Sequence, residues 1–192
     1  MGKFFENLHR VLVAGLVLAI LVALLRHSSE LSSEIYWAGI MRWIHVFFGI
    51  LWIGLLYYFN FVQIPSMPKI PDEQKPAIGK VIAPTALFFF RWAAAATVLF
   101  GLLTAGANHY LVEALTLQAP AVTIGIGMWL ALIMAANVWF VIWPNQKKAL
   151  GIVQAEPDAK KAAARIAMLA SRTNTMLSIP MLYCMVMHKL IG

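Results

Sequence analysis

Charged residues are scarce in this sequence of 192 residues: only 12% are Asp, Glu, Lys or Arg, whereas 61% are hydrophobic. Soluble domains carry about 25% charged residues, so the composition excludes that class and indicates an integral membrane protein. The apolar runs lack the alternation, in segments of about ten residues, that marks a transmembrane barrel. Each run must satisfy its backbone hydrogen bonds within the lipid, and the sequence therefore predicts an all-α fold.

Cysteine is nearly absent as well. The single Cys184 lies inside an apolar segment, and an internal disulfide, a zinc site or a covalently attached c-type haem would require more cysteines. Paired carboxylates at membrane depth, a Ser/His/Asp set and a glycine-rich phosphate loop are also missing. Proton-coupled transport, hydrolysis and nucleotide binding therefore have no support. The net charge of +7 does not indicate nucleic-acid binding, because no basic run is interleaved with exposed aromatics.

Five apolar segments are each about long enough to cross a hydrocarbon layer of about 30 Å. They are residues 8–26, 36–64, 84–107, 121–144 and 173–191. The first of them resembles the apolar part of a signal peptide, but no convincing cleavage site follows it, and we interpret it as a retained helix. Residues 156–171 predict a further, alanine-rich connector helix. No separate soluble domain is indicated, so residues 1–192 are expected to form a single membrane domain.

Positive charge predicts the orientation of the chain. Lysines and arginines gather in segments 65–83 and 145–172, and Lys3 and Arg10 precede the first helix, whereas segment 108–120 has neither residue type. Cytoplasmic loops collect Lys and Arg, so five helices place the N-terminus in the cytoplasm and the C-terminus outside. We therefore expect a multi-pass bundle of about five transmembrane helices in a lipid bilayer.

Two histidines are predicted at similar depth on different helices. At about 1.5 Å per residue, His45 lies roughly 27 Å above the cytoplasmic edge of its helix, and His188 roughly 24 Å above the edge of its own. A bis-histidine haem b between helices requires this arrangement, because the axial ligands come from opposite sides of one ring. Gly49 and Gly54 would let a flat ring approach the helix of His45.

Other residues remain alternatives for the second axial position. Met185 and Met187 offer thioether ligands, and His109 also falls toward the outer side. The plain alternatives are a histidine at a helix end without a ligand role and methionines that only fill the core.

Two arginines are candidates for holding an anionic group. An arginine at membrane depth is costly, which makes Arg91, roughly 10 Å inside the cytoplasmic edge, a functional candidate. Arg42 precedes His45 by one helical turn. Either guanidinium would neutralise a haem propionate, and the alternative for Arg91 is to extend toward the interface.

The stretch NVWFVIWPNQKK, residues 137–148, predicts a helix end at the cytoplasmic interface. Asn137 lies deeper, where we expect a hydrogen bond across helices or to Asn60 or Arg91 at comparable height. The candidate haem ligands lie at the opposite face, so we interpret this stretch as a structural lock.

Four segments resemble, in this order, the membrane N-terminal domain of bacterial urate oxidases that carry a C-terminal cytochrome c. They are IHVFFGILWIGLLYYFNFVQIP, RWAAAATVLFGLLT, NVWFVIWPNQKKALG and ASRTNTMLSIPML. More distantly, the His-x-x-x-Gly-x-x-Trp and Arg-x-Asn-x-x-x-x-x-Pro patterns are similar to haem-dependent protoporphyrinogen oxidase and to copper-resistance D membrane proteins. In that oxidase a histidine of the early helix is thought to ligate haem b, and it corresponds to His45 here.

The resemblance implies a redox protein with haem b in the cytoplasmic (inner) membrane of a bacterium, either an oxidoreductase or a subunit of one. It does not by itself imply urate as the substrate. The fused enzymes carry their own cytochrome c, whereas these residues contain no CxxCH. Either a separate cytochrome c is then the electron acceptor, or the protein has a different role.

Two other functions remain open. A cofactor-free accessory subunit of a respiratory complex would use the many aromatic side chains for helix contacts, and an oligomer of this chain is open as well. Copper handling has weaker support, because the ten methionines are scattered and form no Met-x-x-Met cluster.

Overall fold

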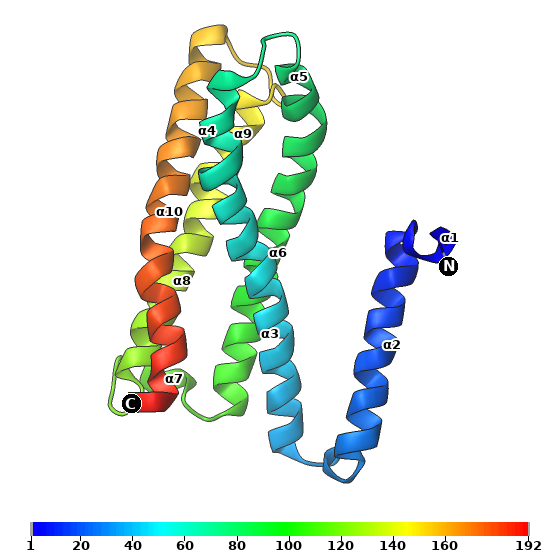
Figure 1. Cartoon of the computed structure of the whole chain (residues 1–192). Coiled ribbons are helices and arrows are strands. Elements are labelled where there is room, and N and C mark those ends of the chain that lie inside the picture. The colour runs from blue at the N-terminus through cyan, green and yellow to red at the C-terminus, as the bar shows by residue number, and fades with distance from the viewer. Residues whose placement is uncertain (1, 192) are drawn as a thin grey trace.

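The computed structural model describes residues 2–191, which are mostly helical with no strand among them. Four long helices form a bundle, and a fifth long helix stands to one side of it (Figure 1). The bundle consists of α3 (Glu34–Tyr57), α6 (Ala83–Ala107), α8 (Val122–Asn137) and α10 (Pro157–Ile191), and the separate helix is α2 (Leu8–His27). The shorter helices are α1 (Gly2–Phe5), α4 (Ile64–Ser66), α5 (Lys75–Ala77), α7 (Leu111–Leu115) and α9 (Trp143–Ala149). The expected all-α membrane bundle is confirmed.

Four helical segments of the described chain are long and apolar enough to cross a membrane. They are Leu8–Glu30, Glu34–Lys69, Lys75–Ala107 and Val122–Ala149, and they cover the first four predicted segments apart from residue 121. The fifth predicted segment, 173–191, is helical but is not separate from the connector helix predicted at 156–171. Both belong to α10, a single helix of 35 residues.

Polar residues in the middle of α10 explain why the sequence suggested two helices there. Thr173 and Thr175 interrupt the apolar pattern, yet their hydroxyls donate to the carbonyls of Leu169 and Ser171, one turn back in the same helix. A threonine that bonds in this way is accommodated within a helix. The backbone therefore continues without a break.

Three of the prolines within helical segments come shortly after a π-helical turn. The turns are Tyr58–Gln63 before Pro65, Ile78–Ile82 before Pro84 and Val138–Ile142 before Pro144. Proline lacks an N–H group and its ring crowds the carbonyl one turn back, and the wider π turn provides the room. Two helical segments consequently extend past their predicted ends, to Lys69 and to Ala149.

Small residues and one hydrogen-bonded pair of asparagines bring the bundle helices together. Ala94 on α6 is fully buried, and a Cβ at Gly127 of α8 would lie 3.0 Å from the Cβ of Cys184 on α10. Asn137 donates to the Asn174 side chain at 2.8 Å, and Asn174 donates to a carbonyl of α8 at 2.9 Å. The hydrogen bond across helices expected for Asn137 is thus present, but its partner lies on α10 and is neither Asn60 nor Arg91.

Helix α2 has no buried residue. Most of its apolar side chains are exposed, and Figure 1 shows the helix apart from the bundle. In a membrane, lipid or another protein would cover this helix.

The contact between α7 and α8 depends on a glycine. A Cβ at Gly125 would overlap the backbone carbonyl of Ala114 and lie 2.9 Å from the Leu117 side chain. We expect Gly125→Ala to lower the thermal midpoint in detergent by about 2–10 °C, because overpacking costs about 1–3 kcal/mol. Gly39→Ala is the matched control, since a Cβ there meets nothing within 4 Å. Equal midpoints for the two variants would contradict this packing.

Candidate functional site

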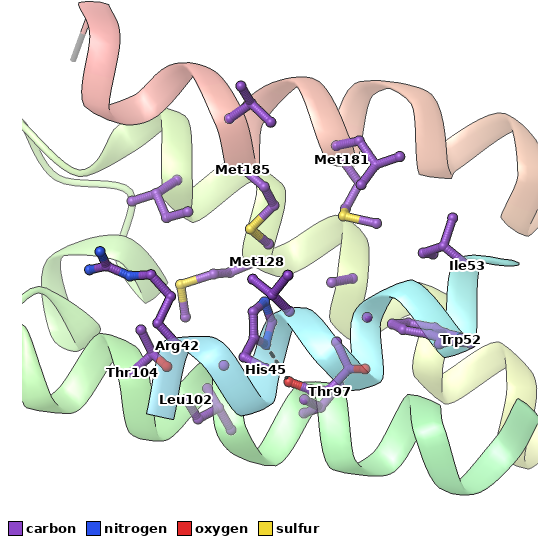
Figure 2. A pocket seen from close by; sticks show the side chains of 18 of the residues that line it. Arg42, His45, Trp52, Ile53, Thr97, Leu102, Thr104, Met128, Met181 and Met185 are labelled. Atoms are coloured by element: carbon purple, nitrogen blue, oxygen red, sulfur yellow. Dashed lines mark hydrogen bonds between the residues drawn. The ribbon is translucent and has the colours of Figure 1, made fainter. Parts of the chain in front are cut away.

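A cavity of about 480 Å³ lies between α3, α6, α8 and α10 (Figure 2). This volume falls within the range of about 300–1,000 Å³ that is usual for small-molecule and cofactor sites. We call the end of the bundle that carries Lys69, Lys75, Lys147 and Lys148 the basic end. The cavity lies toward the opposite end, where α3 begins and α10 finishes.

The side chain of His45, on α3, lines the cavity, and one of its ring nitrogens makes a hydrogen bond. Its Nδ1 lies 2.7 Å from the backbone carbonyl oxygen of Thr97 on α6. A carbonyl only accepts, so Nδ1 carries a proton and donates it, and in the neutral ring Nε2 then has the lone pair. Histidines that ligate metals typically hold their other ring N–H in this way.

A glycine on α6 makes this contact possible. A Cβ at Gly101 would lie 2.9 Å from both Nδ1 and Cε1 of His45, closer than real Cβ atoms approach other atoms. Gly101 follows Thr97 by one turn, so it clears the space beside the Thr97 carbonyl. The His45 imidazole therefore packs directly against the backbone of α6.

His188, on α10, lines the same cavity. Its Nδ1 lies 2.9 Å from the carbonyl of Met185 in its own helix, so Nε2 again keeps its lone pair. The hydroxyls of Tyr57 and Ser178, 2.9 Å apart, mark a common level of the antiparallel helices α3 and α10. From that level His45 lies about 18 Å along α3 and His188 about 15 Å along α10. The structure thus brings the two predicted histidines to one cavity at similar depth.

Three methionines also reach the cavity. Met128 enters from α8, and Met181 and Met185 enter from α10, with their sulfur atoms on the side that faces His45 (Figure 2). Met185 therefore remains an alternative second ligand. Met187 and His109 are not among the lining residues, and His109 lies in the turn after α6 with a left-handed φ of 58°.

Arg42 and Tyr110 form a polar end of the cavity. Arg42 donates to the side-chain oxygen of Asn108 at 3.2 Å, and no carboxylate pairs with it among the residues that the structure describes. Burial raises the pKa of the Tyr110 phenol, although the nearby charge of Arg42 opposes this shift. The phenol therefore keeps its proton at neutral pH. This end offers a cation and a hydroxyl donor to an anionic group.

Arg91 is separated from this cavity. Its guanidinium carbon lies 3.9 Å from the ring centroid of Trp143 and 5.3 Å from that of Phe88, and it donates to the carbonyl of Leu87 at 3.4 Å. A cation–π contact of a partly exposed arginine contributes about 0.5–1 kcal/mol. Trp143 belongs to the stretch 137–148, so this stretch holds Arg91 at the basic end.

Sequence reasoning missed several residues of the cavity. Thr97, Gly101 and Trp52 lie within segments that resemble the urate oxidase domain, but nothing in their spacing connects them to a histidine on another helix. Among the described residues, no three His, Cys, Asp or Glu side chains come together as a metal site. An iron held in a macrocycle needs only axial ligands from the protein, and the cavity has candidates for both positions.

These features define a helical membrane bundle with a histidine-containing cavity between its helices. Residues 91–190, about half of the chain, match the family described as urate oxidase N-terminal. The chain belongs to this family. The matched residues include Gly101, His188 and the stretch 137–148, whereas Arg42 and His45 lie before them. No curated protein and no solved structure matches the chain.

Proposed function

We propose that this protein binds haem b in the cavity and transfers electrons in the membrane, with His45 as an axial ligand. The observation that carries the proposal is the hydrogen bond made by the His45 ring. Its Nδ1 is held by the Thr97 carbonyl at 2.7 Å, which leaves Nε2 free to coordinate, and the ring reaches into the cavity (Figure 2). A bound haem would supply reversible one-electron chemistry.

The remaining lining residues suit the parts of such a group. Gly49 and Gly54 lie on the cavity side of α3, and a Cβ at Gly54 would meet nothing within 4 Å, so a flat ring has access to this helix. Arg42 and Tyr110 would bind a propionate. His188 is the proposed second ligand because it lies level with His45, and Met185 is the alternative.

The location of the cavity indicates on which side of the membrane a redox partner would bind. It lies away from the basic end, and the positive-inside pattern assigns that opposite end to the outer side of a bacterial inner membrane. A separate cytochrome c at that surface would approach the cavity from the side of Arg42. We therefore include such a cytochrome as the proposed electron acceptor.

The test is an absorption spectrum of the protein purified in detergent from haem-replete cells. We expect a Soret band, α and β bands on reduction, and about one haem per chain by pyridine haemochrome assay. A colourless preparation would overturn the proposal.

A second candidate is a cofactor-free accessory subunit of a respiratory complex. The observation in its favour is α2, whose side chains have no buried position within this chain and are available to another subunit. Affinity purification distinguishes the two functions. A stable complex with haem only in the partner would support the second function and contradict the first.

A further inference from the structure

The contact between α10 and α3 with its continuation becomes more polar toward the basic end. Next to the cavity it is apolar, but beyond Trp52 it contains hydrogen-bonded polar pairs. Asn60 donates to the hydroxyl of Ser171 at 2.7 Å, and the hydroxyls of Tyr57 and Ser178 are 2.9 Å apart. Ser171 is 7% exposed and Ser178 is completely buried, so these pairs are internal to the bundle.

Helix α10 carries its hydroxyls on successive turns along this contact. Ser178 donates to the carbonyl of Thr175 at 2.7 Å, and Thr175 donates to the carbonyl of Ser171 at 3.2 Å. Each hydroxyl oxygen still has acceptor capacity on its other side. Together with the facing side chains, these residues form what we call the polar seam, which consists of Tyr57, Asn60, Gln63, Ser171, Thr175 and Ser178.

Three buried side-chain atoms of the described chain have no hydrogen-bond partner, and all three belong to one helical segment. They are Nε1 of Trp52, Oδ1 of Asn60 and Oε1 of Gln63. Their spacing places them along one face of α3 and its continuation. Buried polar atoms are rarely left without a partner, and water commonly supplies the partner where protein groups do not.

The unpartnered atoms run from the cavity to the basic end. Trp52 is 1% exposed and lines the cavity together with Met181. Gln63 lies about 16 Å farther along the helix, close to the end at Lys69. Asn60 and Tyr57 lie between them. The polar seam therefore extends from near the inner end of the cavity toward the basic end, along α3 and its continuation.

We propose that the polar seam holds a file of water molecules and conducts protons between the basic end and the inner end of the cavity. Each water in such a file accepts a proton on one side and releases another on the other side, while the hydroxyl and amide groups of the seam hold the waters in place, so no group is left charged. The use of this path rests on the proposed function, since an electron added at low dielectric is stabilised by an accompanying proton. The presence of water does not depend on haem.

The test measures hydrogen exchange at the indole Nε1 of Trp52 by NMR of the ¹⁵N-labelled protein in micelles, under reducing conditions. We expect this indole to exchange with D₂O although its side chain is buried. Tyr57→Phe removes one hydroxyl of the seam and should slow the exchange at least about tenfold. The matched control is Tyr58→Phe, because Tyr58 is the neighbouring, partly buried tyrosine outside the polar seam, and the loss of its hydroxyl should leave the rate unchanged.

Asn60→Leu, which keeps the side-chain shape, should slow the exchange in the same way and provides the measurement if Tyr57→Phe does not fold. The proposal is overturned if the wild-type indole exchanges as slowly as in these variants, or if the variants exchange as fast as wild type. The measurement gives the same information with or without haem. A colourless protein whose Trp52 exchanges quickly would therefore refute the proposed function and retain the hydrated seam.

Discussion

In the His45→Ala variant we expect the Soret band to disappear from protein purified in detergent. Alanine removes the Nε2 lone pair that would coordinate iron and leaves the Thr97 carbonyl without its partner at 2.7 Å. Loss of an outer-shell contact typically weakens metal binding by about 10–100-fold. Loss of the ligand itself should therefore reduce haem affinity by at least about 100-fold. The measurement is the haem content per chain, together with a titration of the apoprotein.

His109→Ala is the matched control for this experiment. His109 lies in the turn after α6 and does not line the cavity, so its removal should leave the spectrum unchanged. A Soret band that survives in His45→Ala, or that is lost equally in both variants, would show that His45 is not the ligand. Normal elution of His45→Ala on size exclusion would establish that the variant is folded.

The second large effect is expected from Gly101→Ala, although this residue cannot coordinate iron. The new methyl group would lie 2.9 Å from Nδ1 of His45 and would push the ring off the Thr97 carbonyl. The imidazole would then be misplaced relative to the cavity. We expect haem affinity to fall by about 10–100-fold, which is the usual effect of losing an outer-shell contact. Haem titration and the position of the Soret band report this change.

Gly106→Ala provides the comparison on the same helix. A Cβ at Gly106 would meet nothing within 4 Å, so this substitution introduces the same chemical change without a clash. We expect its spectrum and affinity to match the wild type. Equal haem binding in the Gly101 and Gly106 variants would show that the contact between α6 and His45 does not position the ligand.

Several residues of the candidate site could be inferred from the sequence because the inference needs only their depth in the membrane. The distance along a helix is proportional to the number of residues, so His45 and His188 could be placed at similar height before their helices were known to be adjacent. Arg42 could be added because it precedes His45 by one turn. The structure brings these three residues to one cavity.

Other parts could not be inferred because they depend on how the helices are rotated. The predicted depth of Arg91 also made it a candidate for binding an anion. Its guanidinium carbon instead lies 3.9 Å from the ring centroid of Trp143, and Arg91 does not line the cavity. Asn137 was expected to bond across helices, and only the packing of α8 against α10 selected Asn174 as its partner. The π turns before the prolines also escaped prediction, since proline suggests the end of a helix.

The sequence by itself determined that this protein is a bundle of membrane helices, because scarce charge and long apolar runs leave the backbone no other way to satisfy its hydrogen bonds in lipid. The tertiary structure alone decided which polar groups meet. His45 and Thr97 are 52 residues apart in the chain, and their contact requires that α3 and α6 pack at one rotation and that Gly101 leave the space open. Helical periodicity describes the faces of one helix, and only packing determines which face of another helix lies opposite.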